Sequence, residues 1–300
     1  MVGGFDVGGQ RARVLCCGSD VSNWSDALAA LHESLAGRRH PIDLASRSLA
    51  VDSMRRIGEG HPIVIDLGCS LGPILEDLHR SLPHAHLIGA DYLLGPLEKQ
   101  AERLPEIPFL QFDLRKCPLP DACVDGVTCL NVLEHIDDDV AALGHIFRII
   151  RPGGVAHIEL PAGPGLYDIY DQYLMHHRRY KLGHLLTMAR RVGFVVERAT
   201  HLGFFAYPGF WAVKKRNRRR LGLPPEDRER IVASQIQWTC SSRVFGALVR
   251  LELALGRALS YPWGIRCIAI LRKPAPTTGC ASSVAMSGHP SRELPGHDGA

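Results

Sequence analysis

The chain of 300 residues is 46% apolar and 22% charged, which suits one α/β domain with an elaboration or with unstructured tails. A formal net charge of +4, from 35 basic and 31 acidic residues, gives no whole-chain sign of a nucleic-acid-binding protein. Nine cysteines form no Cys-x-x-Cys pair and several lie in apolar, strand-like runs, so buried free thiols in a reducing compartment fit best. No signal peptide or transmembrane stretch stands out, so we expect a cytoplasmic protein.

The two ends have the composition of unstructured segments. Residues 1–9 contain four glycines, and residues 274–300 are rich in Pro, Ser, Gly and Thr. We predict disordered tails over 1–23 and 274–300. Residues 24–57 show helical periodicity in two pieces that are split at His40-Pro41, which predicts an N-terminal helical lid over 24–60.

From residue 61 onward, short β-branched runs alternate with amphipathic helices. The predicted strands cover 63–67, 85–90, 109–112, 125–130 and 155–160, and the predicted helices between them cover 71–81, 95–104 and 138–150. This alternation specifies a parallel sheet with helices on both faces, whose ligands bind beyond the carboxyl ends of the strands.

The end of the predicted domain, which covers 61–273, carries an unusual connection. A helix over 181–192 is closed by Gly193 and followed by a strand over 195–200, and a last strand covers 265–271. About sixty residues, 201–264, separate these two strands, whereas neighbouring strands are usually joined by a few residues. We predict that this insertion is structured and functional.

The most informative segment is a strand that runs into a glycine turn and then a helix. A dinucleotide-binding fingerprint would need glycines at the first, third and sixth places, which here hold Gly68, Ser70 and Pro73. Asp66 would also repel a pyrophosphate, whereas it would attract a ligand's ammonium group. The pattern therefore disfavours a nicotinamide-dependent oxidoreductase, which we keep as the alternative function.

Acidic residues end the first three predicted strands. Asp91 ends the second strand and can accept hydrogen bonds from two ribose hydroxyls, and Asp113 ends the third and can accept from an adenine amino group. The helix after the glycine turn offers free N–H groups to a carboxylate. A ligand with a carboxylate, an ammonium, a ribose and an adenine fits this whole stretch.

Residues 62–194 and the last strand resemble the class I, Rossmann-like S-adenosylmethionine-dependent methyltransferases, in particular the bacterial small-molecule type with a Leu-Glu-His motif. The matching segments are 66–72 (Asp-Leu-Gly-Cys-Ser-Leu-Gly), 89–91, 112–114, 131–136 (Asn-Val-Leu-Glu-His-Ile) and 151–154. The resemblance implies a seven-stranded, mostly parallel sheet, with S-adenosylmethionine as cofactor and S-adenosylhomocysteine as product. It assigns cofactor binding to Asp66, Gly68, Cys69, Ser70, Gly72, Asp91, Tyr92, Asp113, Leu114 and Asn131.

Methyl transfer requires mainly an acceptor held in line with the methyl group, with a base when the acceptor is a hydroxyl. We assign a catalytic role to His135 as this base and to Glu134, which would orient it or contact the cofactor; both side chains can equally be structural. His177, Arg179 and Tyr180 would line the acceptor pocket, or else form a solvated helix start with Tyr180 as a packed anchor. The 15 histidines include no His-x-x-x-His pair, so we predict no metal site.

The insertion combines aromatic residues at 204–211 with a basic run at 214–220. This composition suits the headgroup region of an anionic membrane or a phosphorylated, lipid-like substrate; the alternative is a packed core with a solvated helix face. We predict a small-molecule or lipid- or glycan-linked acceptor, peripheral membrane contact through 204–220 and no nucleic-acid partner. A non-catalytic module with the same fold is a further alternative, and the sequence does not choose the acceptor atom or the oligomeric state.

Overall fold

The computed structural model describes residues 4–7, 9–18, 40–58 and 60–275. These residues form an eight-stranded sheet in the order β3-β6-β5-β4-β7-β8-β10-β9, besides a ribbon of β1 (Phe5–Val7) and β2 (Gln10–Ala12). The strands of the sheet are β3 (Val14–Cys16), β4 (Ile63–Leu67), β5 (His86–Asp91), β6 (Phe109–Gln111), β7 (Val124–Leu130), β8 (Ile150–Pro161), β9 (Val195–Leu202) and β10 (Arg266–Arg272). Only β10 runs antiparallel to its neighbours in this sheet, so the α/β, mostly parallel architecture is confirmed.

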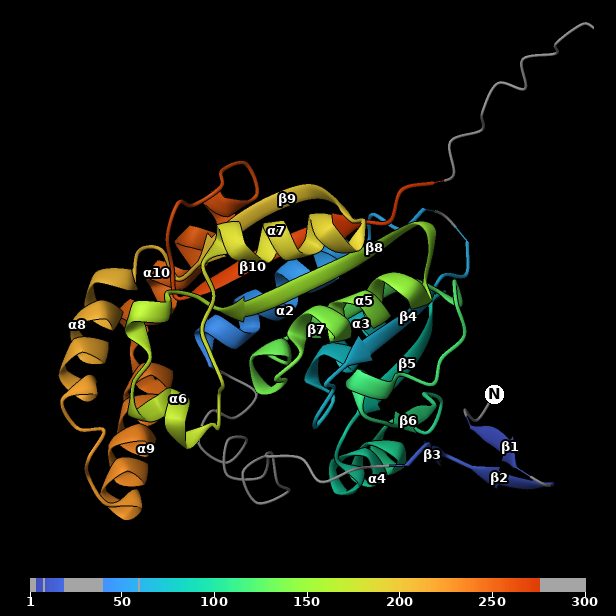
Figure 1. Cartoon of the computed structure of the whole chain (residues 1–300), viewed down its shortest axis with the longest axis horizontal. Helices are drawn as coiled ribbons and strands as arrows, with labels where there is room; N and C mark the ends of the chain where they lie inside the picture. Colours follow the sequence, from blue (N-terminus) through green and yellow to red (C-terminus); the bar gives the residue numbers. More distant parts are fainter. Residues whose placement is uncertain (1–3, 8, 19–39, 59, 276–300) are drawn as a thin grey trace, which may run out of the picture.

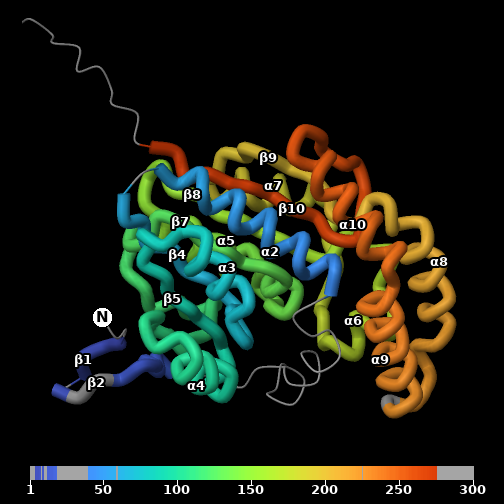
Figure 2. The backbone as a smooth tube through the Cα atoms, turned by 180° about the vertical axis from the view of Figure 1, so that it is seen from behind, coloured from blue at the N-terminus to red at the C-terminus, as the bar shows by residue number. Residues whose placement is uncertain are grey.

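Helices cover both faces of the sheet (Figures 1 and 2). One face packs against α2 (Pro41–Met54), α3 (Pro73–Ser81) and α4 (Leu94–Arg103), and the other against α5 (Asp139–Ile149) and α7 (Leu182–Val192). The local sequence explains the helix ends: Pro73 occupies the first turn of α3, the Asp138 carboxylate caps α5, and Gly193 ends α7 with a φ of 112°. Each helix thus buries one apolar side on the sheet.

The eighth strand lies where we predicted a disordered tail. Val14–Cys16 pairs in parallel with Phe109–Gln111, and Val14 and Leu15 pack against the core. The prediction of disorder over 1–23 is therefore wrong for this stretch, and so is the count of seven strands. Three apolar residues among glycines and arginines form a strand because an edge strand is available to pair with them, which composition alone does not reveal.

The predicted lid is described only in its second half, because 24–39 lie outside the described residues, as do 276–300. The second half is α2, which packs on β7 and β8 and against α10 (Arg243–Gly256). Its first residues also reach the cavity described below, through His40 and Asp43. α2 therefore supports the sheet and contributes to the site.

Between β9 and β10 the chain forms α8 (Tyr207–Arg218), α9 (Pro225–Ser241) and α10. In Figure 1, α8 and α9 stand beyond one end of the sheet, together with the short α6 (Ile169–Tyr173). α6 and α9 share a small core of Ile169, Val232 and Ile236. Three one-turn 3-10 helices follow strand ends: η1 (Leu114–Lys116), η2 (Leu133–His135) and η3 (Pro164–Leu166).

Candidate functional site

A cavity of about 1600 Å³ lies at the carboxyl ends of the parallel strands and extends to α6, α8 and α9. Residues that follow four strands line it together, namely Gly68 after β4, Asp91 at the end of β5, Asp113 after β6 and Asn131 after β7. Ser70, Tyr92 and Leu114 also line it. Most of the side chains that the sequence assigned to a cofactor therefore face one crevice, at the sheet edge where parallel strands present ligand sites.

Asp91 ties the glycine turn to the second strand of the crevice. Its Oδ2 accepts a hydrogen bond from the backbone N–H of Ser70 at 2.8 Å, and its Oδ1 accepts from the N–H of Leu93 at 3.0 Å. Each carboxylate oxygen can accept more than one hydrogen bond. Asp91 can therefore receive ribose hydroxyls while it holds the turn in place.

Asp66 lies behind the cavity wall. Its side chain is buried; Oδ1 accepts a hydrogen bond from the Thr128 hydroxyl at 2.6 Å, and Oδ2 has no partner among the described residues. Burial raises the pKa of Asp66 to about 8, although the Thr128 hydrogen bond opposes this. A buried carboxylate with one unpartnered oxygen is suited to an ammonium group that approaches through the glycine turn.

Asp113 is engaged by a residue that sequence reasoning missed. The Arg115 guanidinium donates to Asp113 Oδ2 through Nε at 2.9 Å and through Nη2 at 2.7 Å, and the Arg115 N–H donates to Oδ1 at 2.8 Å. An adenine amino group would share this carboxylate with Arg115. The signal was present in the sequence, because a basic residue two positions after a strand-end carboxylate can fold back onto it.

The glycine turn separates residues that face the cavity from residues that support it. Gly68 has a φ of +76°, and a Cβ there would lie 2.3 Å from Val132 Cγ2, so only glycine fits. Gly72 precedes the first residue of α3, and a Cβ on Gly72 would lie 2.6 Å from Gln100 Oε1. The Cys69 side chain is buried in the core. Gly72 and Cys69 thus do not line the cavity, as Asp66 does not, and their assignment to the cofactor stays a prediction.

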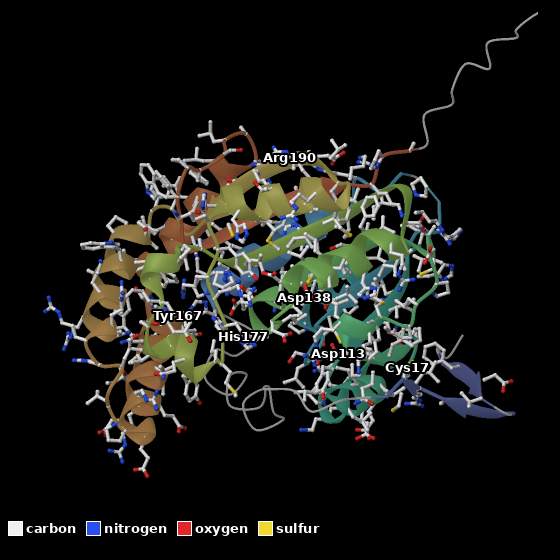
Figure 3. The ribbon with its side chains drawn as sticks, in the orientation of Figure 1. Cys17, Asp113, Asp138, Tyr167, His177 and Arg190 are labelled. Atoms are coloured by element: carbon white, nitrogen blue, oxygen red, sulfur yellow. The ribbon has the colours of Figure 1, made fainter. Side chains whose placement is uncertain are left out.

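The side of the cavity that the sequence predicts to hold an acceptor, called the acceptor side below, begins at η2. Glu134 and His135 line the cavity, as do His177 and Arg179. Figure 3 places His177 between Tyr167 and Asp113 in the view. Tyr180 does not line the cavity: it is buried in the core, and its hydroxyl lies 2.6 Å from Asp139 Oδ2. The assignment of Tyr180 to the acceptor pocket is corrected, because this bond anchors the ring to α5.

Buried ion pairs hold the helices around the acceptor side. Lys214 of α8 lies 2.5 Å from Asp168 Oδ1 and 3.1 Å from Asp171 Oδ2, and Arg179 donates to Asp171 Oδ1 at 2.7 Å. Burial alone would raise the pKa of Asp171, but the His176 hydrogen bond and the charges of Lys214 and Arg179 lower it below its usual range. Lys214 therefore belongs to the interior and not to the basic surface predicted for 214–220.

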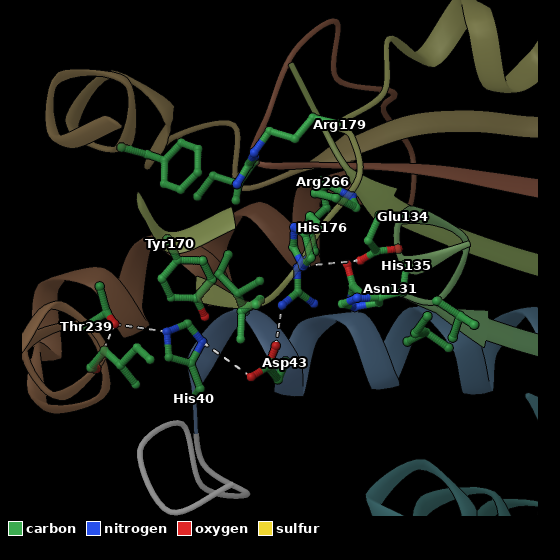
Figure 4. A pocket seen from close by; sticks show the side chains of 18 of the residues that line it. His40, Asp43, Asn131, Glu134, His135, Tyr170, His176, Arg179, Thr239 and Arg266 are labelled. Atoms are coloured by element: carbon green, nitrogen blue, oxygen red, sulfur yellow. Dashed lines mark hydrogen bonds and ion pairs between the residues drawn. The ribbon is translucent and has the colours of Figure 1, made fainter. Parts of the chain in front are cut away.

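A second charged group lies beside Glu134 and His176, as Figure 4 shows. Arg266 of β10 donates to Glu159 Oε1 at 2.7 Å and pairs with Asp43 of α2 at 2.5 Å. Asn131, which has a φ of +54°, lies beside it, with its Nδ2 3.4 Å from the same Glu159 oxygen. Sequence reasoning missed Arg266 and Asp43, because they lie 223 residues apart in the chain.

Comparisons with known proteins agree with this geometry. Residues 65–158 match the family described as methyltransferase domain. The chain is 34% identical over 112 residues to the trans-aconitate 2-methyltransferase of Azoarcus sp., covering 37% of this chain and 43% of the relative. It is 32% identical over 143 residues to the demethylmenaquinone methyltransferase of Thermus thermophilus, covering 44% and 64%. The chain spans about half of the length of the curated relatives it matches.

Solved structures show the same fold. The phosphoethanolamine N-methyltransferase 2 of Haemonchus contortus, in complex with S-adenosyl-L-methionine, has a TM-score of 0.55 at 14% identity, over 83% of this chain and 57% of that chain. This chain carries a class I methyltransferase domain. The [4+2]-cyclase SpnF, with a TM-score of 0.50 at 17% identity over 78% of this chain and 81% of that chain, shares the fold as well. The reaction must therefore be argued from the site.

The methyltransferase domain fits S-adenosylmethionine by its own residues. Asp66 offers an unpartnered buried oxygen, Gly68 allows close backbone approach, and Asp91 lies twenty-odd residues further along at the neighbouring strand end. The helices of the described residues include none that is both long and apolar enough to cross a membrane.

Proposed function

We propose that this chain transfers a methyl group from S-adenosylmethionine to a small-molecule or lipid- or glycan-linked acceptor and releases S-adenosylhomocysteine. One observation carries the proposal: a single cavity joins the crevice of Gly68, Asp91 and Asp113 to a chamber under α8 and α9. A donor and an acceptor can thus meet in it without passing through bulk solvent. Proximity and exclusion of water are the main contributions that a protein makes to this reaction.

The chamber favours an acceptor that is partly apolar. Aromatic and aliphatic side chains form much of its lining, among them Tyr170, Phe205, Phe210, Trp238 and Leu248. The buried Arg179 and the partly buried Arg266 line the same chamber, although each is paired with a carboxylate. An acceptor with an apolar body and one oxygen-rich end matches this combination.

The methyl donor supplies an activated methyl group on a sulfonium. The residues of the chain therefore have only to bind the donor, orient the acceptor and remove the proton of a hydroxyl acceptor. Asp66 would bind the ammonium group and Asp91 the ribose. Asp113, with Leu114 and Tyr92, would bind the adenine. Asn131 would form the floor of the crevice. His135 would accept the proton of a hydroxyl acceptor. His177 and Arg179 would orient the acceptor from the opposite side.

Peripheral contact with an anionic membrane through 204–220 is the second part of the proposal. Trp211 and Val213 of α8 are 47% and 42% exposed, and the side chains of Lys215, Arg216 and Arg218 are exposed beside them. Exposed aromatics next to cations favour a headgroup region, with about 1 kcal/mol for each basic residue near the surface. Cosedimentation with vesicles of phosphatidylserine, compared with neutral vesicles, tests this contact.

Calorimetry with S-adenosylhomocysteine tests the donor site. We expect binding of the product but not of NADH, and Asp91→Ala should weaken binding about 10- to 100-fold because hydrogen bonds to a charged group are lost. Asp227→Ala, on the exposed start of α9, is the matched control and should bind normally. Binding of NADH instead, or equal affinity of the Asp91 variant, contradicts the assignment.

Mass spectrometry of cell extracts, incubated with the protein and an isotopically labelled methyl donor, tests the transfer itself. A labelled product that depends on Asp91 supports the enzyme. Product binding without any labelled acceptor supports the non-catalytic alternative.

A further inference from the structure

Three potential metal ligands converge on the acceptor side of the cavity. Glu134 and His135 come from η2, and His176 comes from the loop after α6, about forty residues further along the chain. Their donor atoms, one carboxylate oxygen and two imidazole nitrogens, all lie within 4.8 Å of one another. Figure 4 shows the three side chains together at one wall, with Glu134 Oε1 3.9 Å from His176 Nε2.

Glu134 is the strongest sign that this cluster binds something. Its side chain is fully buried, and neither carboxylate oxygen has a hydrogen-bond partner among the described residues. A buried carboxylate without a donor or a cation is costly, and almost every buried polar group in a protein has a partner. Its two oxygens therefore call for a ligand that supplies positive charge or donated protons.

His176 is held in the orientation typical of a metal ligand. Its Nδ1 lies 3.0 Å from Asp171 Oδ1, an acceptor, so the proton sits on Nδ1 and the lone pair of Nε2 points toward Glu134. Asp171 is itself fixed by Arg179 and Lys214. A carboxylate that orients a histidine through its second nitrogen is the usual outer-shell arrangement of zinc sites.

The surrounding charges leave room for a cation. Arg179 is paired with Asp171, and Arg266 with Asp43 and Glu159, so each nearby guanidinium already has its own carboxylate. Glu134 is the carboxylate of this wall that has no such pair at hydrogen-bonding distance among the described residues. A divalent ion would supply the charge that Glu134 lacks.

We propose that Glu134, His135 and His176 bind a divalent transition-metal ion, with Zn²⁺ as the best match, and leave at least one coordination position open to the cavity. Two imidazoles and one carboxylate are a ligand set of zinc sites that keep an open position. With bonds of about 2.1 Å, donors on a tetrahedral ion lie about 3.4 Å apart, so the three side chains must close in by roughly 1 Å. A metal-bound His135 would not also accept a proton, so this site is an alternative to the role of His135 as base. The test of metal binding is independent of methyl transfer.

Histidines that are close together in the sequence do not form this cluster, which is why their spacing predicted no metal site. His176 reaches the cluster because the chain returns from α6 to η2, where the His177 N–H donates to the Glu134 carbonyl at 2.8 Å. Such a site is visible only after folding.

Metal titration of the full chain, with any affinity tag removed and after treatment with a chelator, tests the site. We expect one Zn²⁺ per chain by isothermal calorimetry and elemental analysis, and a visible d–d absorption band when Co²⁺ is added instead. His176→Ala and Glu134→Gln should each lower the affinity about 100-fold or more and abolish the Co²⁺ band. Asp171→Asn, which leaves all three ligands in place, should lower it about 10- to 100-fold.

His177→Ala is the matched control, because it removes a neighbouring cavity-lining histidine that is outside the ligand set. It should keep the stoichiometry and the Co²⁺ spectrum. Circular dichroism of each metal-free variant shows whether it folds, and only folded variants are compared. Absence of binding, or binding that the His176 and Glu134 variants retain in full, overturns the proposal, since retained binding would come from other histidines or cysteines.

Discussion

The proposed donor crevice and the proposed acceptor chamber are adjacent parts of one cavity, but they are built by different interactions. In the crevice, Asp91 accepts hydrogen bonds from the backbone N–H groups of Ser70 and Leu93, which lie 21 and 2 residues away in the sequence. In the chamber, charged side chains join more distant segments: Lys214 reaches Asp168 across 46 residues, and Arg266 reaches Asp43 across 223. A local motif can be recognised in a sequence, whereas a chamber assembled from distant charges depends on the whole fold.

The largest effect should come from the chamber. Lys214→Met leaves Asp168 and Asp171 without their shared cation in a buried position, which should lower the free energy of unfolding by about 3–5 kcal/mol. Urea denaturation measures the loss. Lys215→Met, at the next and exposed position of α8, should change stability by no more than about 0.5 kcal/mol. If both variants are equally stable, the chamber is not held by this ion cluster.

A smaller effect is expected in the crevice. Gly68→Ala forces a Cβ onto Val132 in a backbone conformation that alanine disfavours, at a cost of about 1–3 kcal/mol. Because the strain falls on the cofactor turn, the affinity for S-adenosylhomocysteine should fall together with the melting temperature. Gly183→Ala, in the first turn of α7 with open space around it, should leave both unchanged or raise stability slightly. Normal product binding by the Gly68 variant would mean that the turn does not approach the cofactor.

Gly68 and Lys214 also differ in how well the sequence predicted their places in the fold. The strand-end acids and Gly68 were predicted because each belongs to a short pattern whose spacing reflects the turn geometry. The strand β3 was missed because pairing with β6 outweighs its weak local signal. Tyr180 and Lys214 were placed wrongly because the sequence does not show whether a buried carboxylate will accept a hydrogen bond from the hydroxyl or the ammonium group. In the structure, Asp139 accepts from Tyr180 and Asp168 from Lys214. His176 was not grouped with Glu134 because the two residues are about forty positions apart in the sequence and meet only in the folded chain.

A third expected effect concerns the proton of Asp66. Because burial raises the pKa of Asp66 to about 8, the folded state holds this proton between about pH 4 and 8 while the unfolded state releases it. The contribution of Asp66 to the free energy of unfolding is therefore largest at about pH 4 and is lost as the pH rises toward 8. Asp66→Asn should flatten that part of the pH dependence of the denaturation midpoint.

Cofactor binding should reveal the same proton. An ammonium group favours the ionised carboxylate, so binding of S-adenosylhomocysteine at pH 7 should release close to one proton. Calorimetry in buffers of different ionisation enthalpy measures the release, and Asp66→Asn should abolish it. Equal proton release by the wild-type chain and the variant would show that Asp66 does not meet the ammonium group.

The short strand β3 bears on the behaviour of the whole chain in solution. Without it, the backbone groups of β6 would form a free border of a largely apolar sheet, which is a template for pairing with another molecule. With it, β6 is paired, and the border of the sheet is β3, which is also three residues long and follows the β1–β2 ribbon. Trimming the chain to residue 40, a natural choice for crystallisation, should therefore promote aggregation although it removes no part of the cavity wall described here.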